Sequence, residues 1–161
     1  MRAALSFLAA RREVDPARLG VYGFSVGATA VALESADDPR ARAVALGPTW
    51  PSLAEELADK FHRWGPLSAA VLRWTFRASG VDVAAVDALA AVDRLAGRPL
   101  FFVTGSRDPD TPPAVMARVA ARAPSARWLV VEGAGHGGYA ALDAAALDRG
   151  LGGFFDAALG P

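Results

Sequence analysis

The most informative segment of this chain is Leu19-Gly20-Val21-Tyr22-Gly23-Phe24-Ser25-Val26-Gly27. Residues 19–24 form a short, nearly continuous apolar run, which predicts a strand buried on both faces of a parallel sheet. A helix is predicted to begin directly after it, over residues 26–33. Ser25 therefore lies on a tight turn from a strand into a helix, and this turn exposes its hydroxyl above the sheet.

The rest of the chain continues the alternation of strands and helices. Three further apolar runs are predicted to be buried strands: 41–46, 100–104 and 128–131. Helical segments are predicted before, between and after the strands: 5–13, 26–33, 52–91, 113–121 and 142–159. This order indicates an α/β fold with a parallel sheet of about four strands flanked by helices.

Length and aromatic content define the predicted domain organisation. A chain of 161 residues is long enough for one domain and too short for two ordinary ones. The region 52–91 is rich in aromatic residues, so it is predicted to form one or two helices over the end of the sheet. These helices form either a small lid or an ordinary layer packed on a sheet face.

Composition excludes several classes of function. Seventeen basic and seventeen acidic side chains give a formal net charge of zero, so no long-range field favours nucleic acid or an anionic membrane. Cysteine is absent and there are only two histidines, which excludes disulfides, thiolate zinc sites and a cysteine nucleophile. We therefore expect no metal, no cofactor, and no nucleic-acid or membrane partner.

A nucleophilic serine needs a base, because its hydroxyl is scarcely ionised at neutral pH. His136 lies in a glycine-rich loop, residues 132–138, directly after the last predicted strand. From such a loop a side chain can extend over the carboxyl edge of the sheet. His62 lies in the helical region beside Lys60, and a solvated helix face explains it better. His136 is therefore the predicted base.

The base in turn needs a carboxylate that holds its tautomer and stabilises the imidazolium. The loop after the strand at 100–104 carries two aspartates. Asp108 is the predicted acid, and Asp110 is the alternative, otherwise explained as a solvated or helix-capping side chain. The resulting chain order of Ser25, Asp108 and His136 is that of one hydrolase superfamily.

Three segments resemble the signature segments of α/β-hydrolases: Gly23-Phe24-Ser25-Val26-Gly27, Gly105-x-x-Asp108 with Thr111-Pro112 behind it, and Gly133-Ala134-Gly135-His136. Within that superfamily the chain is most similar to prolyl-oligopeptidase-like (peptidase S9-like) and dienelactone-hydrolase-like serine esterases. The resemblance implies a hydrolase of carboxylesterase type that cleaves an ester, thioester or amide of a small-molecule acyl substrate. It implies an acyl-serine intermediate, a catalytic triad of Ser25, Asp108 and His136, and no cofactor.

The same motifs define the expected surroundings of the nucleophile. The backbone N–H of Val26 lies at a helix N-terminus, where an anion is stabilised, and is expected to contribute to the oxyanion hole. Gly23 and Gly27 are expected to be required because side chains there would collide with the neighbouring strand and helix. Short acyl chains are the default substrates. Three aromatic residues indicate an apolar substrate pocket, although each also fits an ordinary core or lid position: Phe24, Trp50 and Trp64.

The superfamily's sheet normally has eight strands, and the predicted strands correspond to the last four, so residues 1–161 are expected to form a partial domain. No glycine-rich loop that could supply the second oxyanion N–H precedes Gly23, and loss of one such donor costs roughly 10²- to 10³-fold in turnover. The strand at 19–24 becomes a sheet edge, which favours association. We therefore expect the chain to be a fragment, a gene product whose start was wrongly assigned, or a protomer that completes its sheet in a homo-oligomer.

Two other functions compete with a serine hydrolase. A non-catalytic remnant that acts as a binding or assembly module is favoured by the missing oxyanion loop and disfavoured by the presence of all three triad residues. A dinucleotide-binding fold is indicated by Gly133-x-Gly135-x-x-Gly138, which follows a strand and precedes a helix. That fold needs a further strand with an acid about 20 residues on, whereas here an apolar helix follows.

The beginning of the chain bears on cellular location. Residues 3–10 resemble the short apolar stretch of a secretory signal, but an amphipathic helix that leads into the first strand is the better explanation. No apolar run approaches the ~20 residues needed to cross a bilayer. A cytoplasmic location is therefore expected.

Overall fold

The computed structural model of the protein describes residues 1–160, apart from the side chains of Arg63 and Pro66. Its strands form one sheet in the order in which they occur along the chain: β1 (Leu19–Gly23), β2 (Ala41–Leu46), β3 (Leu100–Gly105) and β4 (Arg127–Val131). All three neighbouring pairs are parallel. The predicted α/β fold with a four-stranded parallel sheet is confirmed, and β1 lies at one edge of it.

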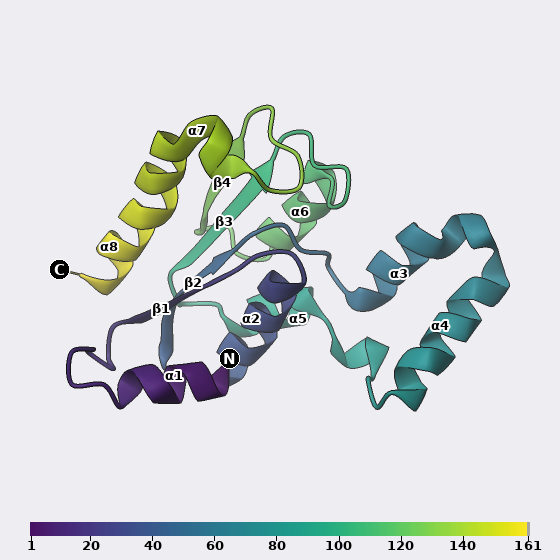
Figure 1. Cartoon of the computed structure of the whole chain (residues 1–161), viewed down its shortest axis with the longest axis horizontal. Coiled ribbons are helices and arrows are strands. Elements are labelled where there is room, and N and C mark those ends of the chain that lie inside the picture. The colour runs from purple at the N-terminus through teal and green to yellow at the C-terminus, as the bar shows by residue number, and fades with distance from the viewer. Residues whose placement is uncertain (161) are drawn as a thin grey trace.

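Helices surround this sheet (Figure 1). The α-helices are α1 (Arg2–Ala9), α2 (Val26–Asp37), α3 (Leu53–Phe61), α4 (Pro66–Ala78), α5 (Ala88–Arg94), α6 (Pro113–Ala120), α7 (Tyr139–Leu147) and α8 (Gly153–Leu159). Shorter turns are the 3₁₀ segments η1 (His62–Trp64) and η2 (Val83–Ala85) and the π-helical η3 (Asp148–Gly152). None of the helices in the described part of the chain is both long and apolar enough to cross a membrane.

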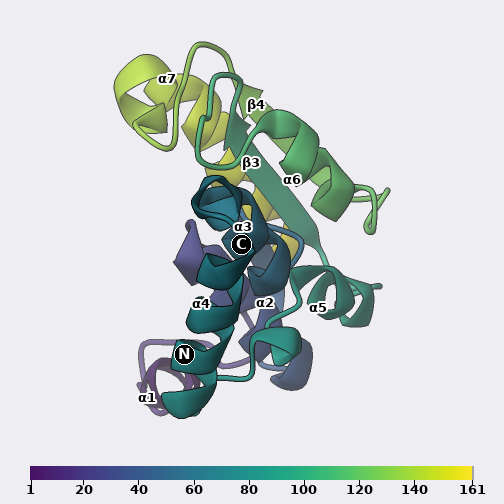
Figure 2. The same ribbon diagram turned by 90° about the vertical axis from the view of Figure 1, so that its right-hand side faces the viewer.

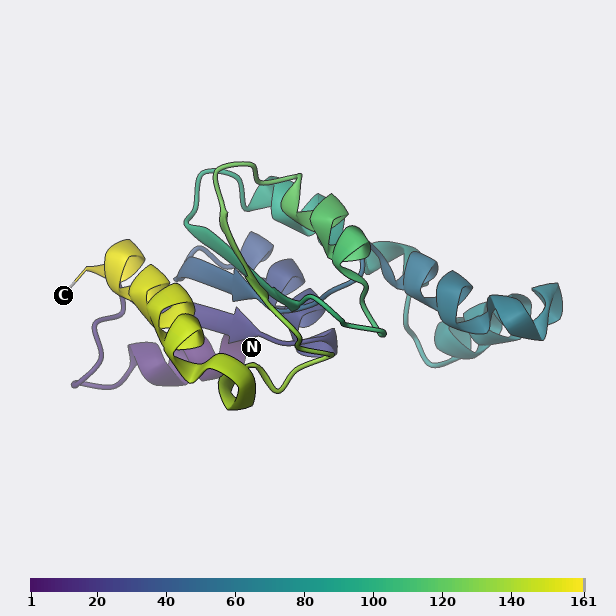
Figure 3. The same cartoon turned by 90° about the horizontal axis from the view of Figure 1, so that it is seen from above.

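Helices cover both faces of the central strands β2 and β3, which explains why these two strands are continuous apolar runs. The edge strands β1 and β4 are exposed at several positions, so the prediction that every strand is buried on both faces is wrong for these two. On β3, Leu100 and Phe102 belong to one core cluster and Phe101 and Val103 to the other. Successive side chains of a strand point to opposite faces, so two cores require apolar residues at every position. Helices α2, α5 and α6 supply the first cluster, and α7 and α8 cover the opposite face, as Figure 3 shows from above.

The first helix differs from its predicted packing. Leu5, Phe7 and Leu8 fit one apolar face of an amphipathic helix, but only Leu5 is buried. Phe7 is 62% exposed, and the guanidinium of Arg11 lies over its ring at 5.3 Å. The apolar pattern predicted a helix here, but at 5–13 rather than over the observed Arg2–Ala9, and the extent of its buried face was overestimated.

The region 52–91 is divided more finely than the predicted one or two helices. Gly65, with a φ of 80°, ends η1, and Pro66 begins α4, because a proline is tolerated in the first helical turn. Gly80, with a φ of 78°, follows the end of α4. Helices α3 and α4 project beyond the sheet (Figures 1 and 3) and lie nearest the viewer in Figure 2, whereas α5 packs against α2 in the core.

Candidate active site

Ser25 lies on the turn between β1 and α2 in a strained backbone conformation. Its φ is 55° and its ψ is −127°, and within residues 1–160 it is the one non-glycine residue with a positive φ. The turn is closed by a 2.8 Å hydrogen bond from the N–H of Gly27 to the carbonyl of Phe24. Conformations of this kind cost about 1–3 kcal/mol and occur at active sites, where the surrounding structure holds them.

The two glycines of the turn have different roles. A Cβ at Gly23 would lie 2.4 Å from the carbonyl oxygen of Gly27 and 2.7 Å from Cα of Ala28, so β1 and α2 approach closely only with glycine there. A Cβ at Gly27 would meet no atom within 4 Å. The expectation that a side chain at Gly27 would collide with its neighbours is therefore wrong, because this position faces outward from the turn.

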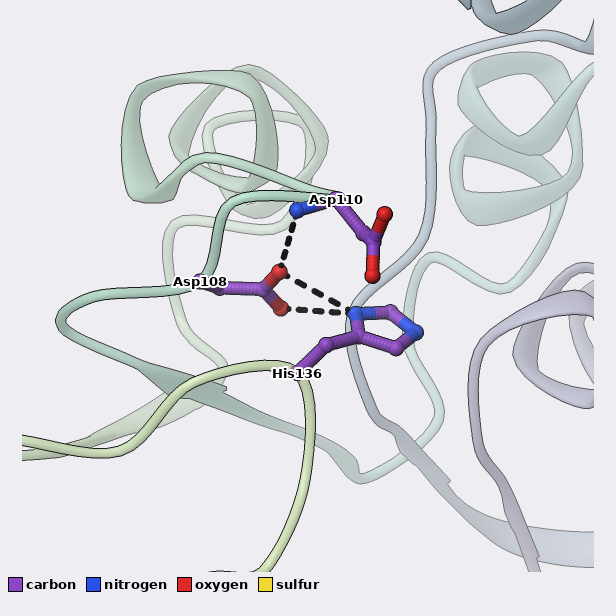
Figure 4. Close-up of side chains that lie close together, drawn as sticks. All are labelled: Asp108, Asp110 and His136. Atoms are coloured by element: carbon purple, nitrogen blue, oxygen red, sulfur yellow. Dashed lines mark hydrogen bonds and ion pairs between the residues drawn. The ribbon is translucent and has the colours of Figure 1, made fainter.

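His136 lies between Ser25 and Asp108. Its Nε2 is 2.9 Å from Oγ of Ser25, and its Nδ1 is 2.9 Å and 3.1 Å from the two carboxylate oxygens of Asp108. The Asp108 side chain is fully buried and that of His136 is 20% exposed. Figure 4 shows the imidazole facing the Asp108 carboxylate. The structure thus brings together three side chains that come from three different loops.

The two aspartates of the β3 loop are in different environments. Oδ1 of Asp108 accepts hydrogen bonds of 2.9 Å from the backbone N–H groups of both Asp110 and Thr111, which fix the carboxylate against His136. The Asp110 side chain is 56% exposed, and its carboxylate lies 3.9 Å from Nζ of Lys60. The Asp110 backbone carbonyl accepts the indole N–H of Trp50 at 3.0 Å. Asp110 therefore positions Trp50 and contacts Lys60, while Asp108 contacts His136.

The loops that carry Asp108 and His136 are held together at their bases. A Cβ at Gly105 would lie only 2.3 Å from the carbonyl oxygens of Ala134 and Gly135, so glycine permits the close approach of the two loops. The N–H of Arg107 donates to the Ala134 carbonyl at 2.8 Å. The hydroxyl of Ser106 accepts from the Gly133 N–H at 2.8 Å and donates to Glu132 at 3.0 Å.

These loop contacts were not predicted as functional, although Gly105 was part of a signature segment. A glycine directly after a buried apolar strand was the available signal in the sequence.

The ring of Phe24 packs against His136. Its ring centroid is 5.1 Å from that of His136 and 6.1 Å from that of Tyr139. Burial and, secondly, the negative charge of Asp108 raise the pKa of the Tyr139 hydroxyl above its ordinary value, so this group stays neutral. His136 thus contacts an aromatic ring that packs in turn on an uncharged tyrosine.

A hollow of about 220 Å³ opens above Ser25 and His136. It is lined by Ser25, Val26, Thr29, Pro48, Thr49, Trp50, Glu56, Lys60, Asp110, Thr111 and His136. Thr29 and Thr49, whose hydroxyls are 2.6 Å apart, were not predicted as site residues. The position of Thr29, one helical turn after Ser25, was the sequence signal for it.

The three aromatic residues predicted for a substrate pocket are separated in the structure. Trp50 is nearly buried and lines the hollow, and Phe24 lies beneath His136. Trp64 is 69% exposed and does not line the hollow, although the neighbouring depression that it lines shares Lys60 and Asp110 with the hollow. His62 is exposed, and its Nδ1 contacts the backbone carbonyl of Asp59, which agrees with the predicted helix-surface position.

The backbone N–H of Val26 is the candidate donor for an oxyanion. Within residues 1–160 it makes no hydrogen bond, and it lies in the first turn of α2. The free N–H groups and the dipole at a helix N-terminus favour negative charge. An oxyanion that forms next to Ser25 would therefore find one preorganised donor on this helix.

Asp108, Asp110 and His136 also offer one ligand atom each within 4.8 Å of one another, so their geometry could hold a metal ion. However, Nδ1 of His136 faces the Asp108 carboxylate and Nε2 faces Ser25. A metal would have to replace one of these hydrogen bonds. The contacts fit a hydrogen-bonded arrangement of Asp108, His136 and Ser25 better than a metal centre.

Comparison with known proteins places this geometry in a family context. A family model described as TAP-like protein matches residues 71–158, which include Asp108 and His136. Two uncharacterized proteins of Mycobacterium tuberculosis strains are 32% identical over 145 residues, which is 88% of this chain and 46% of each relative. The chain thus spans about half the length of the curated relatives it matches.

Solved structures share the fold at lower sequence identity. The α/β hydrolase GrgF from a Penicillium species has a TM-score of 0.71 at 14% identity, over 98% of this chain and 70% of that one. A puromycin-hydrolyzing peptidase of Mycobacterium tuberculosis has a TM-score of 0.71 at 23% identity, over 99% and 24% of the two chains. A Pyrococcus furiosus esterase has a TM-score of 0.71 at 16% identity, over 99% and 60%.

Proposed function

This chain belongs to the TAP-like family of α/β-hydrolases, and from that premise we propose that it is a serine hydrolase that cleaves carboxylic esters. The observation that carries the proposal is the continuous set of hydrogen bonds from Asp108 through His136 to Ser25. Each contact of 2.9 Å lies within hydrogen-bond reach, the geometry that a nucleophile and its base require.

In the first half of the reaction, Oγ of Ser25 attacks the ester carbonyl carbon while Nε2 of His136 takes the hydroxyl proton. Asp108 accepts the hydrogen bond of Nδ1–H, which leaves the lone pair of Nε2 directed at Ser25, and it stabilises the imidazolium that forms. The carbonyl oxygen becomes negatively charged and accepts a hydrogen bond from the backbone N–H of Val26. The C–O bond to the alcohol then breaks, and the alcohol leaves with the proton from His136.

The second half releases the acid. Water loses a proton to Nε2 of His136 and attacks the acyl-serine carbonyl, again with negative charge at the Val26 N–H. The bond to Oγ breaks, Ser25 regains its proton, and the carboxylic acid departs. The strained turn at Ser25 supports this role because it presents Oγ to the hollow rather than to the core.

A fluorophosphonate probe tests the proposal directly, because it forms a covalent bond only with an activated serine. The intact chain should be labelled, Ser25→Ala should not, and His136→Ala should be labelled far more slowly. Ser79→Ala is the matched control, since Ser79 is exposed on the surface after α4 and its loss should leave labelling unchanged.

Two results would contradict the proposal. Labelling that persists in Ser25→Ala would show that a residue other than Ser25 is the nucleophile. No labelling of an intact chain that is folded by circular dichroism would favour a non-catalytic binding module.

A further inference from the structure

A second, apolar groove adjoins the hollow above Ser25. Its volume is about 540 Å³, within the ~300–1,000 Å³ typical of ligand pockets. Five residues line both spaces: Val26, Thr29, Trp50, Glu56 and Lys60. The groove is therefore continuous with the candidate active site.

Two helix faces form the walls of this groove. On α2, its lining residues are Val26, Thr29, Ala30 and Leu33, which have the i, i+3, i+4, i+7 spacing of a single helix face. This face starts one residue after Ser25. A ligand bound to Ser25 can therefore continue along the same helix.

The facing wall on α3 has the same i, i+3, i+4, i+7 spacing and is polar at one end and apolar at the other. Its lining residues are Leu53, Glu56, Leu57 and Lys60. Glu56 and Lys60, which form an ion pair of 3.5 Å, line both the hollow and the groove. Leu53 and Leu57 line only the groove, as does Phe76 of α4. The polar end of the space thus lies at Ser25 and the apolar end lies away from it.

We propose that the groove binds the acyl chain of the substrate, so that the preferred esters carry an unbranched aliphatic acyl group of about eight carbons rather than an acetyl group. The proposal rests on the hydrolase function proposed above. The Val26 N–H orients the carbonyl, while the Val26 side chain, 75% exposed, begins the apolar wall along which the chain extends.

The length follows from helix geometry. From Val26 to Leu33 the axis of α2 rises about 10 Å at ~1.5 Å per residue. An extended chain advances roughly 1.2 Å per bond, since a peptide residue of three bonds spans ~3.3–3.6 Å. The α2 wall therefore accommodates about eight carbons. With each carbon taken as about the size of one liquid water molecule, ~30 Å³, the chain fills less than half of the groove volume of about 540 Å³. The remainder is open to adjustment and water.

The test compares p-nitrophenyl acetate, butanoate and octanoate, which share one leaving group. We expect kcat/KM to rise from acetate to octanoate by up to about fourfold per methylene, the ratio equivalent to ~0.8 kcal/mol. Leu57→Trp and Ala30→Phe fill the groove from opposite walls, and each should lower the octanoate-to-acetate ratio at least about tenfold. Leu67→Trp, on a side chain that is 79% exposed on α4, is the matched control and should keep the ratio.

Binding to the inactive Ser25→Ala variant separates this proposal from the hydrolase proposal. Saturation-transfer NMR with methyl octanoate should show transfer to the alkyl chain, lost when Leu57→Trp or Ala30→Phe is added and kept with Leu67→Trp. If methyl octanoate binds to Ser25→Ala but the parent shows no esterase activity, the hydrolase proposal is contradicted and the groove proposal stands. No binding of methyl octanoate, or a parent kcat/KM that falls from butanoate to octanoate, overturns the groove proposal whether or not Ser25 reacts.

Discussion

Replacement of Gly105 by alanine should disable catalysis by moving the base. The new Cβ would lie 2.3 Å from the carbonyl oxygens of Ala134 and Gly135, whereas ordinary van der Waals contact begins at 3.4 Å. Relief of the overlap requires a separation of 3.4 − 2.3 = 1.1 Å between the β3 loop and the His136 loop. Since His136 directly follows Gly135, its imidazole moves with that loop.

The size of the effect follows from this displacement. The Nε2 to Oγ distance of 2.9 Å would increase by up to the same amount, beyond hydrogen-bond range. A misplacement of about 1 Å costs on the order of 10²-fold in rate. The overpacked contact should also lower the free energy of unfolding by about 1–3 kcal/mol.

The assay measures kcat/KM on p-nitrophenyl butanoate together with urea unfolding followed by circular dichroism. Gly135→Ala is the matched control, because its Cβ would meet no atom within 4 Å although it lies beside the same contact. We expect its activity to stay within about twofold of the parent. A folded Gly105→Ala protein with parental activity would refute the claim that glycine at this position sets the spacing of acid and base.

Three further outcomes are expected. Asp108→Asn should lower kcat about 10⁴-fold because the amide favours the wrong tautomer of His136. Asp110→Asn changes an exposed side chain, so its kcat should stay within about twofold of the parent. Equal losses of kcat in steady-state assays would contradict the choice of Asp108 as the acid. The Arg40 guanidinium lowers the pKa of Asp38 from 3.8 to about 2, so this pair stabilises the fold fully above about pH 4 and its contribution is lost as the pH falls toward 2. Urea unfolding should therefore show Asp38→Asn less stable than the parent at neutral pH, with the gap closing in acid, and a gap independent of pH would exclude this linkage. Because β1 is a sheet edge, sedimentation velocity should detect self-association of the parent that Tyr22→Lys weakens, and a parent that stays monomeric at all concentrations would rule out pairing through β1.

Local patterns were sufficient for much of the fold. The strand at 41–46 was predicted with its observed bounds, and the other strands within one residue at either end. For the central strands β2 and β3 the reason is burial on both faces, which leaves a continuous apolar run. The limits of α1, of α2 and of the 52–91 region were less accurate, and the single helix predicted over 142–159 is divided into α7, η3 and α8. Where a helix ends depends on the backbone angles of residues such as Gly65, and these depend in turn on what packs around them.

The order of residues along the chain was enough to predict which chemical groups follow each strand: Ser25 after β1, Asp108 after β3 and His136 after β4, all at carboxyl ends of parallel strands and hence at one rim. The separations at that rim, the need for glycine at 105 but not at 27, and the groove between α2 and α3 became visible only in the folded molecule. The difference lies in the distance along the chain over which each effect acts. Side-chain periodicity and turn chemistry act between neighbours along the chain, whereas clearances of a few ångströms between distant segments depend on how whole helices and loops pack.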